Sequence, residues 1–388
     1  MVESSGFEFA TAAQILFGPG MLKEIGRIAS QTGSKALVAA GSRQENLQRF
    51  AGLLQASGVE MEHFLVQGEP TVDLVLRGVA AAREAGCDMV IGFGGGSALD
   101  TAKAIAALLT NPGDPLDYLE VVGRGQPLRK TPAPFLAVPT TAGTGSEVTR
   151  NAVLAVPEKQ VKVSLRSPMM LARAALVDPE LTYSLPPEVT AATGMDALAQ
   201  VIEPYVSRRA NHLTDLYCRE GILRAARSLR TAYQNGQDGS AREDMAYASL
   251  MGGLSLANAG LGAVHGFAGP VGGMFDAPHG AVCAALLPPV VIINAQAMAA
   301  REPQHPALFR YQEIARMVTG SPGATITDLT SWLEDLRADL KIPGLGAYGL
   351  RQSDLGVLVE KSAAASSMKA NPLTLTQKEM LRILEMAL

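Results

Sequence analysis

The pattern of apolar residues changes near the middle of the chain, and this change constrains the fold more than any other feature. The first half alternates short apolar runs of strand length with segments of helical periodicity, whereas long segments rich in Ala, Leu and Met dominate the second half. Alternating strands and helices predict a parallel sheet with helices on both faces. The expected fold is therefore an α/β N-terminal domain with a parallel sheet, followed by an all-α C-terminal domain.

A length of 388 residues suits two domains of this kind. We place the boundary at Pro186 and Pro187, because a residue before a proline disfavours helix, which gives predicted domains of residues 1–185 and 186–388. The expected strands cover residues 36–40, 61–66, 88–93 and 135–138. The expected helices cover residues 72–85, 98–109, 188–206, 213–234, 242–259 and 328–340.

The composition argues against several classes of partner. The net charge is -4 and no run of Lys and Arg is present, whereas a nucleic-acid-binding face needs concentrated basic residues. We expect no apolar stretch long enough to span a membrane, and the first residues lack an apolar signal core. The three widely spaced cysteines predict reduced core residues rather than disulfides. We therefore expect a cytoplasmic protein with no nucleic-acid or membrane partner.

Two polar loops follow neighbouring strands of the expected sheet. Gly94, Gly95, Gly96 and Ser97 come directly after one strand, where glycines let the backbone approach an anion and the start of the next helix attracts a phosphate. We expect Ser97 to cap that helix. A tight turn without a ligand is the alternative for the glycines alone.

The second loop follows the strand that ends at Val138, and its small hydroxyl side chains suit phosphate or ribose contacts. Two such loops at the carboxyl ends of strands match the rule for ligand sites in open α/β sheets. The residues that we expect to contact a dinucleotide here are Thr140, Thr141, Thr144 and Ser146.

A third loop follows the first strand and reads Gly41, Ser42, Arg43. An acidic residue at such a position holds the ribose 2′-hydroxyl of NAD, whereas Arg accommodates the 2′-phosphate of NADP. The chain has the Arg and lacks the acid, which indicates NADP. An ordinary exposed Arg in a turn is an equally good interpretation.

Four polar residues of the helical half form a candidate metal site. Asp196 and Gln200 are four residues apart and would share one face of a helix. His265 and His279 lie in a segment that Pro270, Gly272, Gly273 and Pro278 interrupt, so we expect the two histidines to start or end separate helices that face a common point. A carboxylate and two imidazoles are a ligand set for zinc or ferrous iron.

The chain resembles the iron-containing (group III) alcohol dehydrogenase family over nearly its full length. The matching motifs include GFGGGSALDTAKA, PTTAGTGSEVTRNAV, TGMDAL, NAGLGAVHG and PHGAVCAALLP. The resemblance implies the two-domain, dehydroquinate synthase-like fold of that family. It also implies an NAD(P)-dependent dehydrogenase or reductase for a small alcohol or aldehyde, which works as a homo-oligomer, expected here to be a dimer.

The resemblance implies that a divalent metal, iron or zinc, is held by Asp196, Gln200, His265 and His279, and that Asp196, His265 and His279 are catalytic. Most relatives have His where this chain has Gln200. We expect this neutral oxygen ligand to favour oxygen-loving ions. A further family histidine is replaced by Gly269, which we expect to alter the choice of substrate more than the type of reaction.

The resemblance also bears on the cofactor. Gly41 stands where NAD-preferring relatives have Asp, so NADP is slightly favoured over NAD. Lys162 matches a lysine that reaches toward the cofactor, and Asp100 is expected near the nicotinamide.

Three other functions remain open on the sequence. A metal-independent reductase of the maleylacetate reductase type has a related fold. A non-redox lyase or cyclase acting on a sugar phosphate would need several Lys and Arg around the metal, and the segments around His265 and His279 contain almost none. A binding protein without activity would not need the two polar loops.

Overall fold

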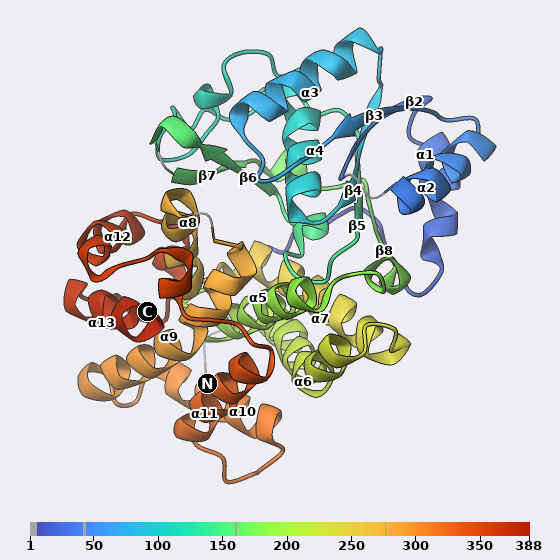
Figure 1. Cartoon of the computed structure of the whole chain (residues 1–388). Helices are drawn as coiled ribbons and strands as arrows, with labels where there is room; N and C mark the ends of the chain where they lie inside the picture. Colours follow the sequence, from blue (N-terminus) through green and yellow to red (C-terminus); the bar gives the residue numbers. More distant parts are fainter. Residues whose placement is uncertain (1–5, 42–43, 160, 276) are drawn as a thin grey trace.

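The structure is a computed structural model that describes residues 6–41, 44–159, 161–275 and 277–388 (Figure 1). In Figure 1 a sheet with helices α1–α4 occupies the upper part of the molecule, and helices α5–α13 lie below it. The expected fold class, an α/β part followed by an all-α part, is confirmed. Every strand that the described residues form ends before Pro179, and helices follow from Pro187 onward. The proposed boundary between residues 185 and 186 stays a prediction.

Six parallel strands form the main sheet in the order β1-β8-β5-β4-β2-β3. Four of them match the expected runs to within one or two residues, and the expectations did not include β1 and β8. The strands are β1 (Ile15–Phe17), β2 (Lys35–Ala40), β3 (Glu60–Leu65), β4 (Met89–Gly94), β5 (Phe135–Pro139) and β8 (Ala174–Val177).

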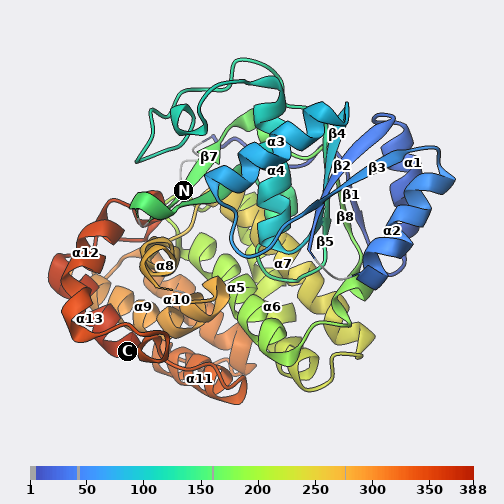
Figure 2. The same ribbon diagram turned by 45° about the horizontal axis from the view of Figure 1, so that its top comes forward.

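Alternate residues of each central strand enter different cores, so both faces of the sheet are buried. In β4, Met89 and Ile91 pack in a core with Phe50 of α2 (Gln44–Ala56), whereas Val90 packs on the opposite face. Figure 2 shows α1 (Ile25–Ser30) and α2 on one side of the sheet, with α3 (Val72–Glu84) and α4 (Gly96–Thr110) on the other.

An antiparallel hairpin lies outside the main sheet, and the sequence analysis did not predict it. It pairs β6 (Asn151–Val156) with β7 (Val161–Arg166). Each strand alternates buried and partly exposed residues, which is the pattern of a strand with one covered face. The hairpin packs on α4 and on α8 (Ala263–Met274), so it lies between the sheet and the later helices.

The four helices expected after Pro187 are present with small shifts at their ends. The helices of this part are α5 (Pro187–Val206), α6 (His212–Gln234), α7 (Gly239–Ala259), α8 (Ala263–Met274), α9 (His279–Arg301), α10 (Pro306–Thr319), α11 (Ile326–Asp339), α12 (Leu355–Ala363) and α13 (Gln377–Ala387). The expected break at Pro270 is wrong, because α8 continues through this proline to Met274. The expected break at Pro278 is confirmed, because this proline is the N-cap of α9.

The expectation about apolar stretches also needs correction. Helix α9 is long and apolar enough to cross a membrane, with a mean hydropathy of 1.8 over its most apolar window. However, 89% of that window is buried inside the protein. Its apolar residues therefore pack against neighbouring helices, as in the core of a globular domain.

Candidate metal and dinucleotide site

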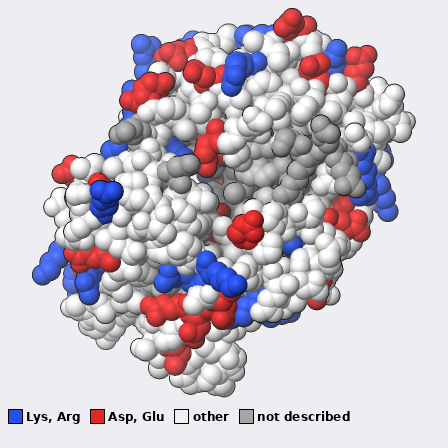
Figure 3. All heavy atoms as spheres, in the orientation of Figure 1, with Lys and Arg blue, Asp and Glu red and all other residues white. Residues whose placement is uncertain are grey.

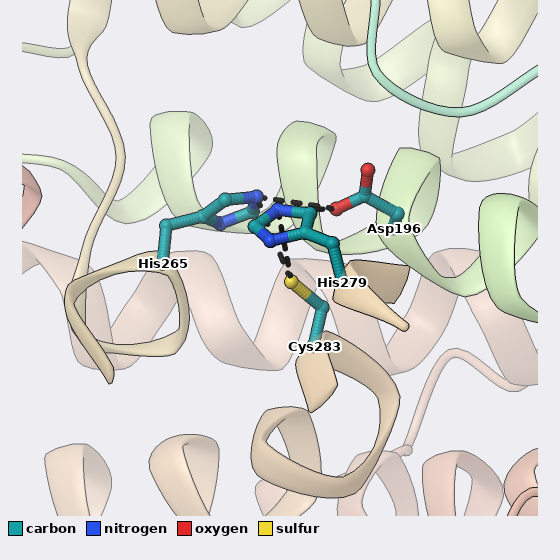
Figure 4. A group of neighbouring side chains, drawn as sticks. All are labelled: Asp196, His265, His279 and Cys283. Atoms are coloured by element: carbon teal, nitrogen blue, oxygen red, sulfur yellow. Dashed lines mark hydrogen bonds and ion pairs between the residues drawn. The ribbon is translucent and has the colours of Figure 1, made fainter. Parts of the chain in front are cut away.

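Three helices bring four metal-binding side chains together (Figure 4). Asp196 lies in the middle of α5, His265 in the first turn of α8, and His279 is the first residue of α9. Cys283 follows His279 by one turn of α9, so both side chains lie on one face of that helix. One ligand atom from each of the four residues lies within 4.8 Å of the others.

Glu203 holds His265 in one orientation. Its Oε2 lies 2.6 Å from Nδ1 of His265, and its Oε1 accepts a hydrogen bond from the backbone amide of Val264 at 2.7 Å. Because a carboxylate only accepts, Nδ1 carries a proton, and Nε2 is the nitrogen that would bind a metal in exchange for its own proton. That Nε2 lies 3.2 Å from Oδ1 of Asp196. The sequence analysis missed Glu203, although it follows Asp196 by seven residues and so shares its face of α5.

Gln200 is oriented differently from what its expected role as a metal ligand requires. Its Nε2 donates to Oδ2 of Asp196 at 2.9 Å, on the carboxylate oxygen that the histidines do not contact. Its Oε1 is buried without a hydrogen-bond partner, and it lies beside Gly252 of α7. The amide nitrogen of Gln200 therefore contacts Asp196, while its carbonyl oxygen lies beside another helix; its role as a metal ligand stays a prediction.

The charges around the cluster favour a positive group at its centre. Burial alone would raise the pKa of Asp196, but the imidazoles of His279 and His265 lower it below its ordinary value. Burial also disfavours a charged His265, yet the neighbouring sulfur and carboxylates hold its pKa well above the ordinary value. The sulfur of Cys283 is the main cause that raises the pKa of His279 to about 9. A divalent cation would replace these protons and satisfy the same electrostatic demand.

The two polar loops meet at the carboxyl edge of the sheet. Strands β4 and β5 are neighbours in register, and the amide of Thr140 donates to the carbonyl of Gly94 at 2.9 Å. A Cβ at Gly96 would lie only 2.7 Å from Cγ2 of Thr144, and one at Gly95 would lie 3.2 Å from Cγ2 of Thr141. Glycine is therefore needed at these positions because the second loop packs directly against the first.

The N-terminus of α4 keeps the features of an anion site. Gly95 is the N-cap, so the expectation that Ser97 would cap the helix is wrong; Ser97 is the second residue of α4. Among the described residues no side chain caps α4, and its first turn carries no acidic residue. Gly95, Gly96 and Ser97 are partly exposed, which leaves the amides of the first turn accessible to a phosphate.

Asp100 has structural partners within the chain. One carboxylate oxygen accepts from the hydroxyl of Ser146, and the other accepts from the amide of Val153 at 2.8 Å. Lys103, which the sequence analysis overlooked, extends beneath the same loop and donates to Ser146 and Thr149. This network fixes the second loop and β6 against α4.

Two of the remaining predicted cofactor residues, Lys162 and Gly41, are described in the structure. Lys162 of β7 is mostly buried against α8, where Nζ lies 3.1 Å from the position of a Cβ on Gly272 and pairs with Glu69 at 3.1 Å. Gly41 directly follows β2, and a Cβ placed there would meet no atom of the described residues within 4 Å. Ser42 and Arg43 lie outside the described residues.

The second loop also touches the helix that carries Asp196. A Cβ at Gly143 would lie 2.7 Å from Cβ of Thr193, which precedes Asp196 by three residues on α5. Figure 3 shows the surface hollowed where the upper and lower parts of the molecule meet, with acidic side chains at the rim. The two polar loops and the metal-type cluster, which is the group Asp196, His265, His279 and Cys283, therefore lie in one region between the sheet and the helices α5–α13.

Comparisons with known proteins agree with this arrangement. A family model described as iron-containing alcohol dehydrogenase matches residues 12–179, and the C-terminal model of the same family matches residues 190–388. The chain is 35% identical over 379 residues to alcohol dehydrogenase 4 of Schizosaccharomyces pombe, covering 96% of this chain and 87% of that protein.

Two solved structures show the same similarity over the whole chain. A 1,3-propanediol oxidoreductase has a TM-score of 0.91 and 32% identity, covering 99% of this chain and 100% of that one. Sulfoacetaldehyde reductase from Bifidobacterium kashiwanohense, in complex with NAD+, has a TM-score of 0.86 and 28% identity, covering 99% of both chains.

Proposed function

The chain belongs to the iron-containing alcohol dehydrogenase family and is a metal-dependent alcohol oxidoreductase, and we propose that it interconverts a small alcohol and its aldehyde or ketone. The observation that carries this proposal is the contact between the second polar loop and α5, three residues from Asp196. It supports a dinucleotide site and a metal site that serve one reaction. In this proposal residues 1–185 bind the dinucleotide, and residues 186–388 hold the metal.

The donor set of the cluster fits a divalent metal. Asp196, His265 and His279 supply one oxygen and two nitrogen atoms from buried or half-buried side chains. A metal held there would act as a Lewis acid toward the alcohol or carbonyl oxygen. Glu203 keeps the lone pair of His265 directed at the cluster, and Gln200 keeps Oδ1 of Asp196 on the same side. These two residues position the ligands.

The loops fit the phosphates of a nicotinamide dinucleotide, which supplies or accepts the hydride when it is bound. Gly95 and Gly96 bring the backbone close to the ligand, and the uncapped amides of α4 favour its negative charge. We infer contacts from Thr140, Thr141 and Thr144, which border this turn. Asp100 and Ser146 support the loop from behind.

We propose NADP as the preferred dinucleotide, with NAD as the alternative. The space beside Gly41 at the end of β2 and the absence of an acidic residue at positions 41–43 support this choice. We also propose a cytoplasmic homodimer. The three cysteines are free thiols in the structure, which suits a reducing compartment.

Removal of the metal tests the proposed function. We expect the chelated protein to lose NADPH-dependent reduction of small aldehydes, and to recover it when zinc or ferrous iron is added. NADPH should give a higher kcat/KM than NADH. Metal content by elemental analysis and NADPH oxidation with an aldehyde panel are the measurements. Full activity in protein shown to be metal-free would contradict the proposal and favour the maleylacetate reductase type.

Gly269→His tests the role of the missing histidine. Residue 269 follows His265 by one turn of α8, and among the described residues outside its own helix a Cβ there would meet the carbonyl oxygen of Lys162, at 3.9 Å. A Cβ on a helical residue directly before a proline crowds the proline ring, so we expect a small loss of stability that Gly269→Ala shares. We expect kcat/KM ratios among aldehydes to change about tenfold or more, with metal content unchanged. Gly269→Ala is the matched control. If the wild type and both variants rank the aldehydes in the same order, residue 269 does not line the substrate pocket.

A further inference from the structure

Cys283 stands in the metal-type cluster, although the sequence analysis treated it as an ordinary core thiol. Its Sγ lies 3.7 Å from Nε2 of His279 and 3.8 Å from Nε2 of His265. The residue is completely buried, and Figure 4 shows its sulfur directed at the two imidazoles. Both distances are long for hydrogen bonds to sulfur, and they lie close to the separations of atoms that surround a common ion.

We propose that Cys283 is the fourth protein ligand of the metal, so that the site is Asp196, His265, His279 and Cys283, with Gln200 outside it. The proposal rests on the proposed metal-dependent function. It goes beyond that function because it assigns a thiolate to the metal and, with it, a preference for thiophilic ions.

The spacing of the four ligand atoms fits a tetrahedral zinc site. With typical bonds of about 2.0–2.1 Å to nitrogen or oxygen and about 2.3 Å to sulfur, the corners of such a site lie about 3.3–3.6 Å apart. Here Oδ1 of Asp196 lies 3.2 Å from Nε2 of His265 and 3.8 Å from Nε2 of His279. The two distances from sulfur to nitrogen are 3.7 and 3.8 Å. Shifts of a few tenths of an ångström would bring these four pairs into the range of a tetrahedral site.

Gln200 is a poor alternative for the fourth position. Its amide nitrogen already donates to Asp196, and its carbonyl oxygen is on the side of Gly252. Turning the amide over would place that oxygen against a carboxylate oxygen of Asp196, where two acceptors would repel. The sulfur of Cys283, in contrast, already faces both histidines.

Binding of a divalent ion by Cys283 involves no oxidation or reduction. The thiol loses its proton to solvent as the bond between sulfur and metal forms, and the metal keeps its charge of +2. Thiolate is a soft ligand that favours zinc over Mg²⁺, Mn²⁺ and other oxygen-loving ions. The expectation from Gln200 alone, which favoured oxygen-loving ions, therefore reverses.

Cobalt substitution tests the ligand without measuring turnover. Co²⁺ bound by a thiolate gives an intense near-ultraviolet charge-transfer band, which oxygen and nitrogen ligands do not give. We expect this band in the wild-type protein loaded with one Co²⁺ per chain. We expect Cys283→Ser to lose the band and to bind Zn²⁺ at least about 100-fold more weakly, whereas the matched control Cys87→Ser keeps both properties.

The outcomes separate this proposal from the proposed function. Wild-type protein with one Co²⁺ per chain but no charge-transfer band would overturn the role of Cys283 and leave the metal-dependent function standing. Wild-type protein that binds neither Co²⁺ nor Zn²⁺ would overturn both. If Cys283→Ser does not fold, the band of the wild type still decides whether a thiolate binds, and Cys87→Ser and Cys218→Ser then assign it: retention of the band in both supports Cys283, and its loss in either one overturns the proposal.

Metal choice gives a second, independent measurement. When the chelated wild-type protein is offered equal concentrations of Zn²⁺ and Mn²⁺, we expect zinc to be retained almost exclusively. Cys283→Asn, which offers an oxygen ligand on a side chain of similar length, should take up measurable Mn²⁺. The same zinc-to-manganese ratio in both proteins would contradict a thiolate ligand.

Discussion

The variant His265→Ala is expected to lose its metal and its catalytic activity together. His265 supplies one of the nitrogen atoms of the cluster, and it is the histidine that Glu203 holds in place. Lewis-acid stabilisation is worth several kcal/mol, and each 1.36 kcal/mol corresponds to a tenfold change in rate. We therefore expect kcat/KM to fall by about 10³-fold or more, with less than stoichiometric metal after desalting.

The loss of His265 also leaves two buried carboxylates without their shared partner. Breaking such a buried arrangement costs about 3–5 kcal/mol, and an unstable variant loses metal and activity whether or not the residue binds the metal. His279→Ala avoids this difficulty, because the imidazole of His279 is 37% exposed and does not contact Glu203. It should show the same joint loss of metal and activity with a smaller loss of stability.

A matched control is His212→Ala at the exposed start of α6. This variant should keep its metal and its rate. Elemental analysis, aldehyde reduction and thermal melting of the three variants are the measurements. Full activity of His265→Ala or His279→Ala in folded protein would remove that histidine from the catalytic site, and full metal content with no activity would limit its role to catalysis.

The parts of the site that depend on local chain geometry could be predicted from the sequence. The strand and the glycines before α4 are consecutive in the chain, so their arrangement follows from a short segment. Proline and glycine between His265 and His279 also indicated that the two histidines lie at ends of separate helices. The break expected at Pro270 did not occur, because packing in the folded protein can outweigh the unfavourable helix propensity of a proline.

The residues that were missed act through partners far away in the sequence. Glu203 contacts His265, which lies 62 positions later in the chain. Cys283 lies beside metal-binding side chains from α5 and α8 as well as from its own helix. Helical spacing was nevertheless a usable signal for both. Glu203 follows Asp196 by seven residues and Cys283 follows His279 by four, which places each on the face of a metal-type residue.

Lys103 is the clearest case of a residue that only the folded structure explains. In the sequence it is one lysine in an Ala-rich helix, three residues after Asp100. In the structure its side chain is 1% exposed, and Nζ donates to the carbonyl oxygens of Ser146 and Asn151, both at 2.8 Å. These acceptors arrive from the second loop and the hairpin, whose positions no local pattern specifies.

Replacing Lys103 with Met is expected to produce a loss of stability as large as that of His265→Ala. Burial lowers the pKa of Lys103 and raises that of Asp100, and each charge offsets part of the cost of burying the other. Removing Lys103 leaves the buried carboxylate of Asp100 without its opposite charge and takes a donor from the carbonyl oxygens of Ser146 and Asn151, which costs about 3–5 kcal/mol. At about 2–4 °C per kcal/mol for a domain of this size, the melting temperature should fall by roughly 6–20 °C.

The pH dependence of Lys103→Met distinguishes a lost charge pair from lost packing. A carboxyl whose pKa is raised by folding binds more protons in the folded state, so its cost to stability grows as pH rises above the unfolded pKa and shrinks as pH falls toward it. The variant should therefore regain part of the lost stability at mildly acidic pH, and Asp100→Asn added to Lys103→Met should recover stability at neutral pH. Urea denaturation at several pH values measures both effects. An equal loss at all pH values, with no recovery in the double variant, would show that Lys103 contributes through packing alone.

A rise in the KM for the dinucleotide should accompany the loss of stability, because the same network holds Ser146 and the second loop against α4.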